Sequence, residues 1–339
     1  MKNFLCMMVG FVAIAQIGLA ATPTATVGGI KWSYTVENGK AVIGGGFFTA
    51  ISTATKGEVT IPSQIAGYTV VAINDYALSE CVNLTGVIIP SGIETIGEFA
   101  FYGCSSLKKV VFPKSVKTIK QYAFYECPSL ENVDVSDVGD WCGVDFGNAS
   151  SNPLNSSGAL YCNGGLVTEL VVSEGVKEIK PNAFCGCTRI KRVDIPASVE
   201  VIGLGAFKGC NSIEWIRVPF VGNKRGLVGN TNFGHIFGAS SYVRNKEAVP
   251  ASLKSVVVFD DSIIAEKAFG ECLGVESVII SNSVVSVGNG AFYGCSNLTS
   301  ITMPNSITDI NDSAFRNCTV LSSVEIPDSV INIGDSAFD

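Results

Sequence analysis

Residues Ile89–Val110 read IPSGIETIGEFAFYGCSSLKKV, and residues Phe112–Val133 read FPKSVKTIKQYAFYECPSLENV. Both stretches place an isoleucine, an Ala-Phe pair, a cysteine, a leucine and a valine at matching positions, so the sequence repeats with a period of 23 residues. A period of about 20 to 29 residues with Leu-x-x-Val-x-Ile spacing is typical of leucine-rich repeats. The sequence therefore predicts a β-rich solenoid, in which each coil is stabilised by stacking on its neighbours.

The repeat can be followed through most of the 339 residues. The Ala-Phe pair recurs at Ala100-Phe101, Ala123-Phe124, Ala183-Phe184, Ala206-Phe207, Ala268-Phe269, Ala291-Phe292, Ala314-Phe315 and Ala337-Phe338. The cysteine recurs at Cys81, Cys104, Cys127, Cys187, Cys210, Cys272, Cys295 and Cys318. We expect the solenoid to span residues 59–339, with enlarged coils at 135–172 and 218–258 that insert residues without breaking the array. The last repeat is expected to be truncated, because the sequence stops just after Phe338.

The residue types within one repeat indicate how the coil is built. Leu-x-x-Val-x-Ile forms a short strand whose last apolar residues point inward, and copies of this strand stack in parallel about 4.8 Å apart. Proline lacks an N–H group and therefore ends that strand. Before the array, Trp32–Val36 and Ala41–Ile43 flank Asn38-Gly39, the strongest short signal of a β-hairpin. Residues 21–58 are therefore expected to form an N-terminal hairpin cap that begins with a flexible lead at Thr22–Thr26.

The phrase Pro-x-x-Val-x-x-Ile-Gly-x-x-Ala-Phe-x-x-Cys resembles that of the BspA-type leucine-rich repeat proteins of bacterial and protist surfaces. The resemblance covers residues 61–339. It implies a right-handed, curved solenoid whose Leu-x-x-Val-x-Ile strands line the concave side. It also implies a surface or secreted role in adhesion and host or matrix binding, with no catalytic residues to carry over.

Residues 1–20 resemble a secretory signal peptide, with Lys2 before an apolar run and small residues at Gly18-Leu19-Ala20. We expect cleavage after Ala20 and a secreted or cell-surface protein. The alternative, a membrane anchor, is less favoured because the run is short for a spanning helix. No other long apolar run predicts a membrane span. The net charge is −7 and no basic cluster exists, which argues against a nucleic-acid partner.

The cysteines admit two interpretations, a disulfide or metal framework and a ladder of buried free thiols. The eight at the repeat position fit the ladder, since cysteine packs as a small apolar residue. Cys142 and Cys162 differ because both lie in the first enlarged coil, and in an oxidising compartment they could form a disulfide that clamps this coil.

Catalytic and metal sites find little support in the sequence. The only histidine, His235, is expected to pack beside Phe233 and Phe237, which argues against a histidine-based triad or multi-histidine metal site. Asp137, Asp140 and Asp145 match no calcium loop and are interpreted as solvated acids. We therefore predict that the protein is not an enzyme and has no cofactor or metal.

Two columns of side chains should point outward from the stacked strands, immediately before and after the central valine of each Leu-x-x-Val-x-Ile. The middle of these columns gathers charge and a tryptophan. The candidate binding surface comprises Asn132, Asp134, Arg192, Asp194, Trp215 and Arg217. Tryptophan and arginine are enriched in binding hot spots. The alternative is an ordinary solvated face with charge pairing between strands.

Two functions remain open. The first is a protein that binds a protein or glycan through its solenoid face. The second is a non-catalytic structural or display module of a larger surface assembly, without a discrete ligand.

Overall fold

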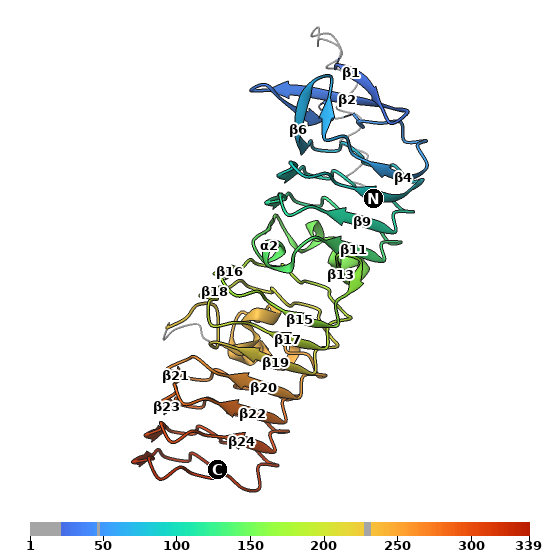
Figure 1. The fold of residues 1–339 in the computed structure, drawn as a ribbon. Helices are drawn as coiled ribbons and strands as arrows, with labels where there is room; N and C mark the ends of the chain where they lie inside the picture. The colour runs from blue at the N-terminus through green and yellow to red at the C-terminus, as the bar shows by residue number, and fades with distance from the viewer. Residues whose placement is uncertain (1–21, 46–47, 227–231) are drawn as a thin grey trace, which may run out of the picture.

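A computed structural model describes residues 22–45, 48–226 and 232–339. The chain forms one elongated stack of coils that runs from the N-terminal cap to the last repeat (Figure 1). Neighbouring coils are joined by parallel strand pairs, such as β7 to β9 and β9 to β11. The predicted solenoid of short parallel strands is therefore confirmed. The predicted signal peptide lies outside the described residues.

The N-terminal cap consists of three antiparallel strands, β1 (Thr24–Val27), β2 (Ile30–Glu37) and β3 (Lys40–Ile43). Asn38 and Gly39 join β2 to β3 with φ angles of 51° and 73°, as a tight hairpin turn requires. Trp32 and Ile43 are fully buried, and β3 continues into the array by pairing in parallel with β6. The predicted hairpin cap is confirmed. The expected flexible lead is wrong, because most of it forms β1 along the edge of β2.

One side of the solenoid carries the longer strands, in two six-stranded sheets. The first contains β4 (Gly57–Thr60), β7 (Leu84–Ile88), β9 (Lys109–Phe112), β11 (Asn132–Val135), β13 (Leu160–Cys162) and β14 (Gly165–Leu166). The second contains β15 (Glu169–Val171), β17 (Arg192–Asp194), β19 (Trp215–Val218), β20 (Ser255–Val258), β22 (Ser277–Ile280) and β24 (Ser300–Thr302). We call the outward side of these sheets the long-strand face. The phrase Leu321–Ile326 forms no strand, unlike its earlier copies.

Shorter strands form a second side, which follows the Val-x-x-Ile part of each repeat. The N-terminal group contains β5 (Gln64–Ile65), β6 (Tyr68–Ile73), β8 (Thr95–Ile96), β10 (Thr118–Ile119) and β12 (Asp145–Phe146). The later groups contain β16 (Glu178–Ile179) and β18 (Val201–Ile202), then β21 (Ile263–Ile264), β23 (Ser286–Val287), β25 (Asp309–Ile310) and β26 (Asn332–Ile333).

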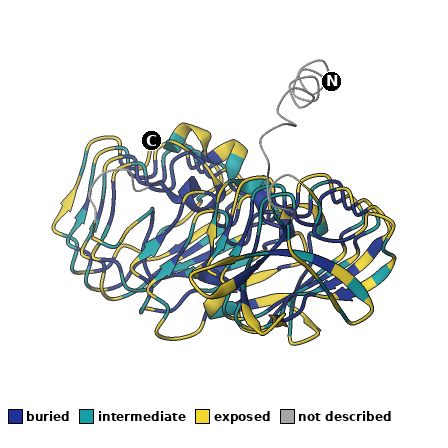
Figure 2. Cartoon of the chain, turned by 90° about the horizontal axis from the view of Figure 1, so that it is seen from above, coloured by how far each residue is buried: buried dark blue, intermediate teal, exposed yellow. Residues whose placement is uncertain are grey.

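The repeated Phe and Cys residues form columns inside the coils, where Figure 2 shows buried residues enclosed by exposed turns. Phe292 stacks between Phe269 and Phe315, with ring centroids 5.1 Å from each. The thiol of Cys127 donates a hydrogen bond to the carbonyl of Phe101, one coil earlier, at 3.1 Å. The same bond recurs at Cys104, Cys210, Cys295 and Cys318. The cysteines are therefore interior residues that join successive coils.

The first enlarged coil interrupts the long-strand ladder. It contains α2 (Val138–Cys142), η2 (Ala149–Ser151) and α3 (Leu154–Ser157) before β13 and β14. β11 pairs with β13, β14 turns back antiparallel on β13, and β15 begins the second sheet. The expectation that this insertion leaves the array unbroken is therefore wrong for the ladder. The core continues across the break, because Trp141 is buried and its indole N–H donates to the carbonyl of Ala183 at 2.8 Å.

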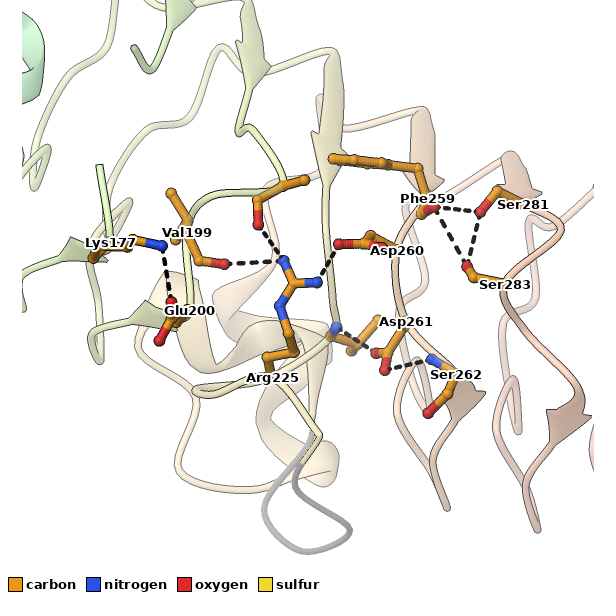
Figure 3. A network of polar contacts seen from close by, with 12 residues as sticks. Lys177, Val199, Glu200, Arg225, Phe259, Asp260, Asp261, Ser262, Ser281 and Ser283 are labelled. Carbon is orange, nitrogen blue, oxygen red and sulfur yellow. Dashed lines mark hydrogen bonds and ion pairs between the residues drawn. The ribbon is translucent and has the colours of Figure 1, made fainter. Parts of the chain in front are cut away.

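The second enlarged coil leaves the ladder intact, since β19 pairs directly with β20. It contains η3 (Phe233–Phe237), η4 (Tyr242–Arg244) and α4 (Asn245–Ala248). Arg225 fixes it to both neighbouring coils, donating to the carbonyls of Ala197 and Val199 and pairing with Asp260 (Figure 3). Asp261 is buried beside this network and accepts hydrogen bonds from the backbone N–H groups of Val221 and Ser262.

Candidate binding surface

Strand alternation sends the predicted outward columns to the long-strand face. In β17 and β19, Val193 and Ile216 are fully buried, whereas the residues on either side of each are partly or fully exposed. Arg192 lies opposite Trp215, and Asp194 lies opposite Arg217, in the parallel register of these strands. The fold therefore brings four of the six predicted residues into one contiguous cluster.

Arg192 and Trp215 are in direct contact across the two strands. The guanidinium carbon of Arg192 lies 4.2 Å from the centroid of the Trp215 ring. The ring quadrupole attracts the cation in this arrangement, an interaction worth roughly 0.5–1 kcal/mol at an exposed site. Because Arg192 forms no ion pair with any described residue, its charge is held in place without being neutralised by a carboxylate.

Arg217 is fixed by two partners. Its Nη1 atom donates to the carboxylate of Asp194 at 2.9 Å, and its guanidinium carbon lies 3.7 Å from the ring centroid of Phe259. Phe259 follows β20 and was not among the predicted residues. The five side chains Arg192, Asp194, Trp215, Arg217 and Phe259 thus form a preorganised surface, which we call the arginine–aromatic platform.

The other two predicted residues lie apart from the platform. Asn132 and Asp134 belong to β11 in the first sheet, on the far side of the ladder break. Asp134 is only 8% exposed, and its carboxylate accepts a hydrogen bond from the N–H of Gly164 at 3.0 Å. It therefore stabilises the turn between β13 and β14. The expectation that Asp134 presents an exposed charge is wrong, because this hairpin covers it.

Cys142 and Cys162, the pair considered for a disulfide, are both free thiols in the structure. Cys142 is fully buried on α2, and this burial raises the pKa of its thiol to about 12. Cys162 is half-buried at the end of β13, where its sulfur accepts a hydrogen bond from the side-chain amide of Asn163 at 3.6 Å. The two thiols therefore lie in different environments, one in the core and one near solvent.

Asp137, Asp145 and His235, which were considered as catalytic or metal-binding candidates, have structural roles. Asp137 caps α2 by accepting from the N–H of Asp140, and Asp145 lies 3.6 Å from the ammonium of Lys180. His235 is buried in η3, where burial lowers the pKa of its imidazole. Across the described residues, no group of three or more His, Cys, Asp or Glu side chains is arranged to hold a metal ion.

The sequence contained a signal for the hairpin that interrupts the ladder. Asn163-Gly164 lies between β13 and β14, with φ angles of 49° and 81°. This is the same dipeptide and conformation that closes the N-terminal hairpin. The rule that places a turn at Asn38-Gly39 also places one here, and so separates the first two predicted surface residues from the other four. A third pair, Asn289-Gly290, lies in a repeat turn rather than between two strands.

The comparison with known families agrees with the observed repeat. A family model described as "BspA type Leucine rich repeat region" matches in 6 copies, over residues 39–142, 157–224 and 252–339. The chain belongs to this BspA-type leucine-rich repeat family. The two gaps between the matched BspA-type segments, residues 143–156 and 225–251, fall within the enlarged coils. These coils are therefore the parts of this chain that depart from the family pattern.

Several solved structures are similar to this BspA-type chain. A leucine rich cell surface protein from Faecalibacterium prausnitzii A2-165 is 23% identical, with a TM-score of 0.39, covering 94% of this chain and 86% of that chain. A leucine-rich repeat protein from Bacteroides ovatus is 22% identical, with a TM-score of 0.40, covering 91% of this chain and 90% of that chain. The pneumococcal vaccine antigen PcpA is 17% identical, with a TM-score of 0.41, covering 93% of this chain and 78% of that chain. No curated protein sequence matches the chain significantly.

None of the helices in the three described segments combines the length and the apolar character needed to cross a bilayer.

Proposed function

We propose that this chain is a secreted or cell-surface protein that binds a protein or glycan through its long-strand face, without catalysis. The arginine–aromatic platform carries the proposal. The signal-like sequence at residues 1–20 and membership of the BspA-type family support the location.

The platform suits an anionic group on the ligand. A guanidinium has five N–H donors, and one ion pair with Asp194 leaves most of those on Arg217 available. Planar donors of this kind match a carboxylate or sulfate. The stacking contacts restrict both arginines before binding, which reduces the conformational entropy lost on association.

Variants of the platform test this proposal against a glycan array that includes sulfated and carboxylated sugars, and against immobilised extracellular-matrix proteins. For any ligand that binds saturably, Trp215→Ala/Arg217→Ala should weaken binding by about 2 kcal/mol or more, roughly 30-fold. The thermal midpoint should change little, because these side chains lie outside the core. Ile279→Ala is the matched control, since Ile279 points outward from β22 of the same sheet. Unchanged binding by the double variant would remove this face from consideration.

The second candidate is a structural or display module without a discrete ligand. Its support is that Arg217 and Asp194 already pair with one another across neighbouring strands, as on an ordinary solvated sheet. Absence of saturable binding to every probe, with self-assembly of the purified chain, would favour this function.

A further inference from the structure

A second cluster of aromatic side chains lies on the turns that carry the Ala-Phe motif, away from the long-strand face. Its members are Tyr76, Phe99, Tyr102, Tyr122 and Tyr125, from three consecutive coils. We call them the aromatic turn patch. None of the five belongs to the hydrophobic core, and Tyr122 and Tyr125 are 36% and 44% exposed.

The patch is built as two columns of rings. Phe99 stacks between Tyr76 and Tyr122, with ring centroids 5.2 and 5.1 Å away and planes tilted by 11° and 15°. Tyr102 and Tyr125 form the second column, with centroids 6.1 Å apart. Edge-on contacts join the columns, at 5.7 Å between Phe99 and Tyr102 and 5.8 Å between Tyr122 and Tyr125. The side chains therefore support one another as a fixed wall.

The first column occupies backbone positions that disfavour large side chains. Tyr76, Phe99 and Tyr122 have φ angles of 59°, 53° and 57°, in the left-handed region. At this position other coils have Asn182, Gly205, Lys267, Gly290, Ser313 and Ser336. All of these except Lys267 are small or adopt left-handed backbone at lower cost. Three successive bulky aromatic residues are therefore costly for folding, and strain of this kind is concentrated at functional sites.

Carboxylates surround the patch. Glu98 and Asp75 lie near Tyr76, where their charges raise the pKa of its hydroxyl in addition to the larger effect of burial. Glu80 and Glu126 lie near Tyr102, whose hydroxyl donates a hydrogen bond to the Glu126 carboxylate. Lys120 neutralises Asp75 at 3.2 Å. Within the described segments, Glu80, Glu98 and Glu126 take part in no ion pair.

We propose that the aromatic turn patch binds a cationic segment of a partner protein, rich in lysine or arginine. The three carboxylates that form no ion pair among the described residues supply the complementary charge. Phenol oxygens supply further hydrogen-bond acceptors, and the exposed rings of Tyr122 and Tyr125 attract cationic side chains. A neutral sugar is less well suited, because it offers no positive charge to the carboxylates around the rings. This site is independent of the arginine–aromatic platform, which has the opposite charge preference.

Removal of the first column gives the sharpest test. Phe99→Gly/Tyr122→Gly replaces two strained aromatic residues with the residue found at this position in other coils. The probe is fluorescein-labelled nona-arginine, measured by fluorescence anisotropy with the full chain. We expect saturable binding by the natural protein, binding at least about tenfold weaker in the double variant, and no fall in its thermal midpoint. A large fall in the midpoint would show that the columns serve the fold, and would overturn the proposal.

A matched pair of charge variants distinguishes a specific site from general attraction to an acidic protein. Glu126→Gln removes a carboxylate at the patch, and Glu271→Gln removes one at the equivalent turn position in a coil outside it; both residues have a left-handed backbone just before a repeat cysteine. We expect only Glu126→Gln to weaken nona-arginine binding. Equal effects of the two variants, or unchanged binding after loss of the aromatic column, would overturn the proposal. Column-dependent binding of a neutral glycan, without nona-arginine binding, would also overturn it by identifying a different ligand.

Discussion

Raising the pH above 9 should destabilise this protein through its buried thiols. Burial raises the pKa of the Cys127 and Cys142 thiols from 9.0 to about 12, and that of Cys81, Cys185 and Cys318 to about 11. Burial also raises it at Cys104, Cys187, Cys272 and Cys295. The folded chain therefore keeps thiol protons that the unfolded chain releases.

The direction of the effect follows from proton linkage. Because the folded pKa lies above the unfolded value, the thiols' contribution to stability is fully present below about pH 9. This contribution is lost as the pH rises from the pKa of the thiols in the unfolded chain toward their pKa in the folded chain. At pH 10 the unfolded thiols are mostly ionised whereas the buried thiols of the folded chain keep their protons, so each favours the unfolded chain by on the order of 1 kcal/mol. Nine such thiols together therefore act on the same scale as the stability of a typical domain, about 5–15 kcal/mol.

Urea unfolding followed by circular dichroism, at intervals from pH 7 to 10.5 with a reducing agent present, measures this loss. The matched variant Cys127→Ala removes one buried thiol from the ladder. Its free energy of unfolding should fall less steeply with pH than that of the natural protein, by about 1 kcal/mol per pH unit near pH 10. Cys162→Ala is the control and should alter the slope less, because Cys162 is half-buried. Equal slopes for Cys127→Ala and the natural protein would refute the reasoning.

Three further predictions concern the solenoid. Phe292→Ala should lower the free energy of unfolding by about 3–5 kcal/mol, because it leaves a cavity between two stacked rings; an unchanged urea midpoint would contradict this. Arg225→Ala should increase amide hydrogen exchange in residues 219–226 and leave residues 84–112 unaffected, since Arg225 joins the second enlarged coil to its neighbours; exchange unaltered in both segments would argue against such a clamp. Gly203→Ala should cost about 1–3 kcal/mol in thermal unfolding, because its Cβ atom would collide with the backbone of Pro181; Gly165→Ala, whose Cβ would meet its nearest atom at 3.4 Å, is the control for steric contact.

Part of the candidate binding surface could be predicted from the sequence. Strand alternation fixes which side of β17 and β19 faces outward, so Arg192, Asp194, Trp215 and Arg217 could be assigned to one face. The contact with Phe259 could not, because it depends on how the chain turns after β20. Asp134 has the same pattern in its strand as Asp194 but is covered by a hairpin that the repeat does not encode.

The sequence by itself determined the coil. A period of 23 residues specifies which residues face inward, where the Phe and Cys columns lie and that successive copies stack in parallel, because each coil buries its apolar side only against similar neighbours. The Asn38-Gly39 pair likewise determined the cap hairpin from local backbone preference. These features depend on local or strictly periodic interactions, which a pattern of residues specifies directly.

Only the tertiary structure decided how the coils are interrupted and what their surfaces present. The first insertion ends one sheet and the second does not, since β11 pairs with β13 whereas β19 pairs across the insertion with β20. The aromatic turn patch also emerges only on stacking, which places residues 23 positions apart in ring contact. Within one coil its tyrosines are isolated turn residues, and contact between coils makes them a surface.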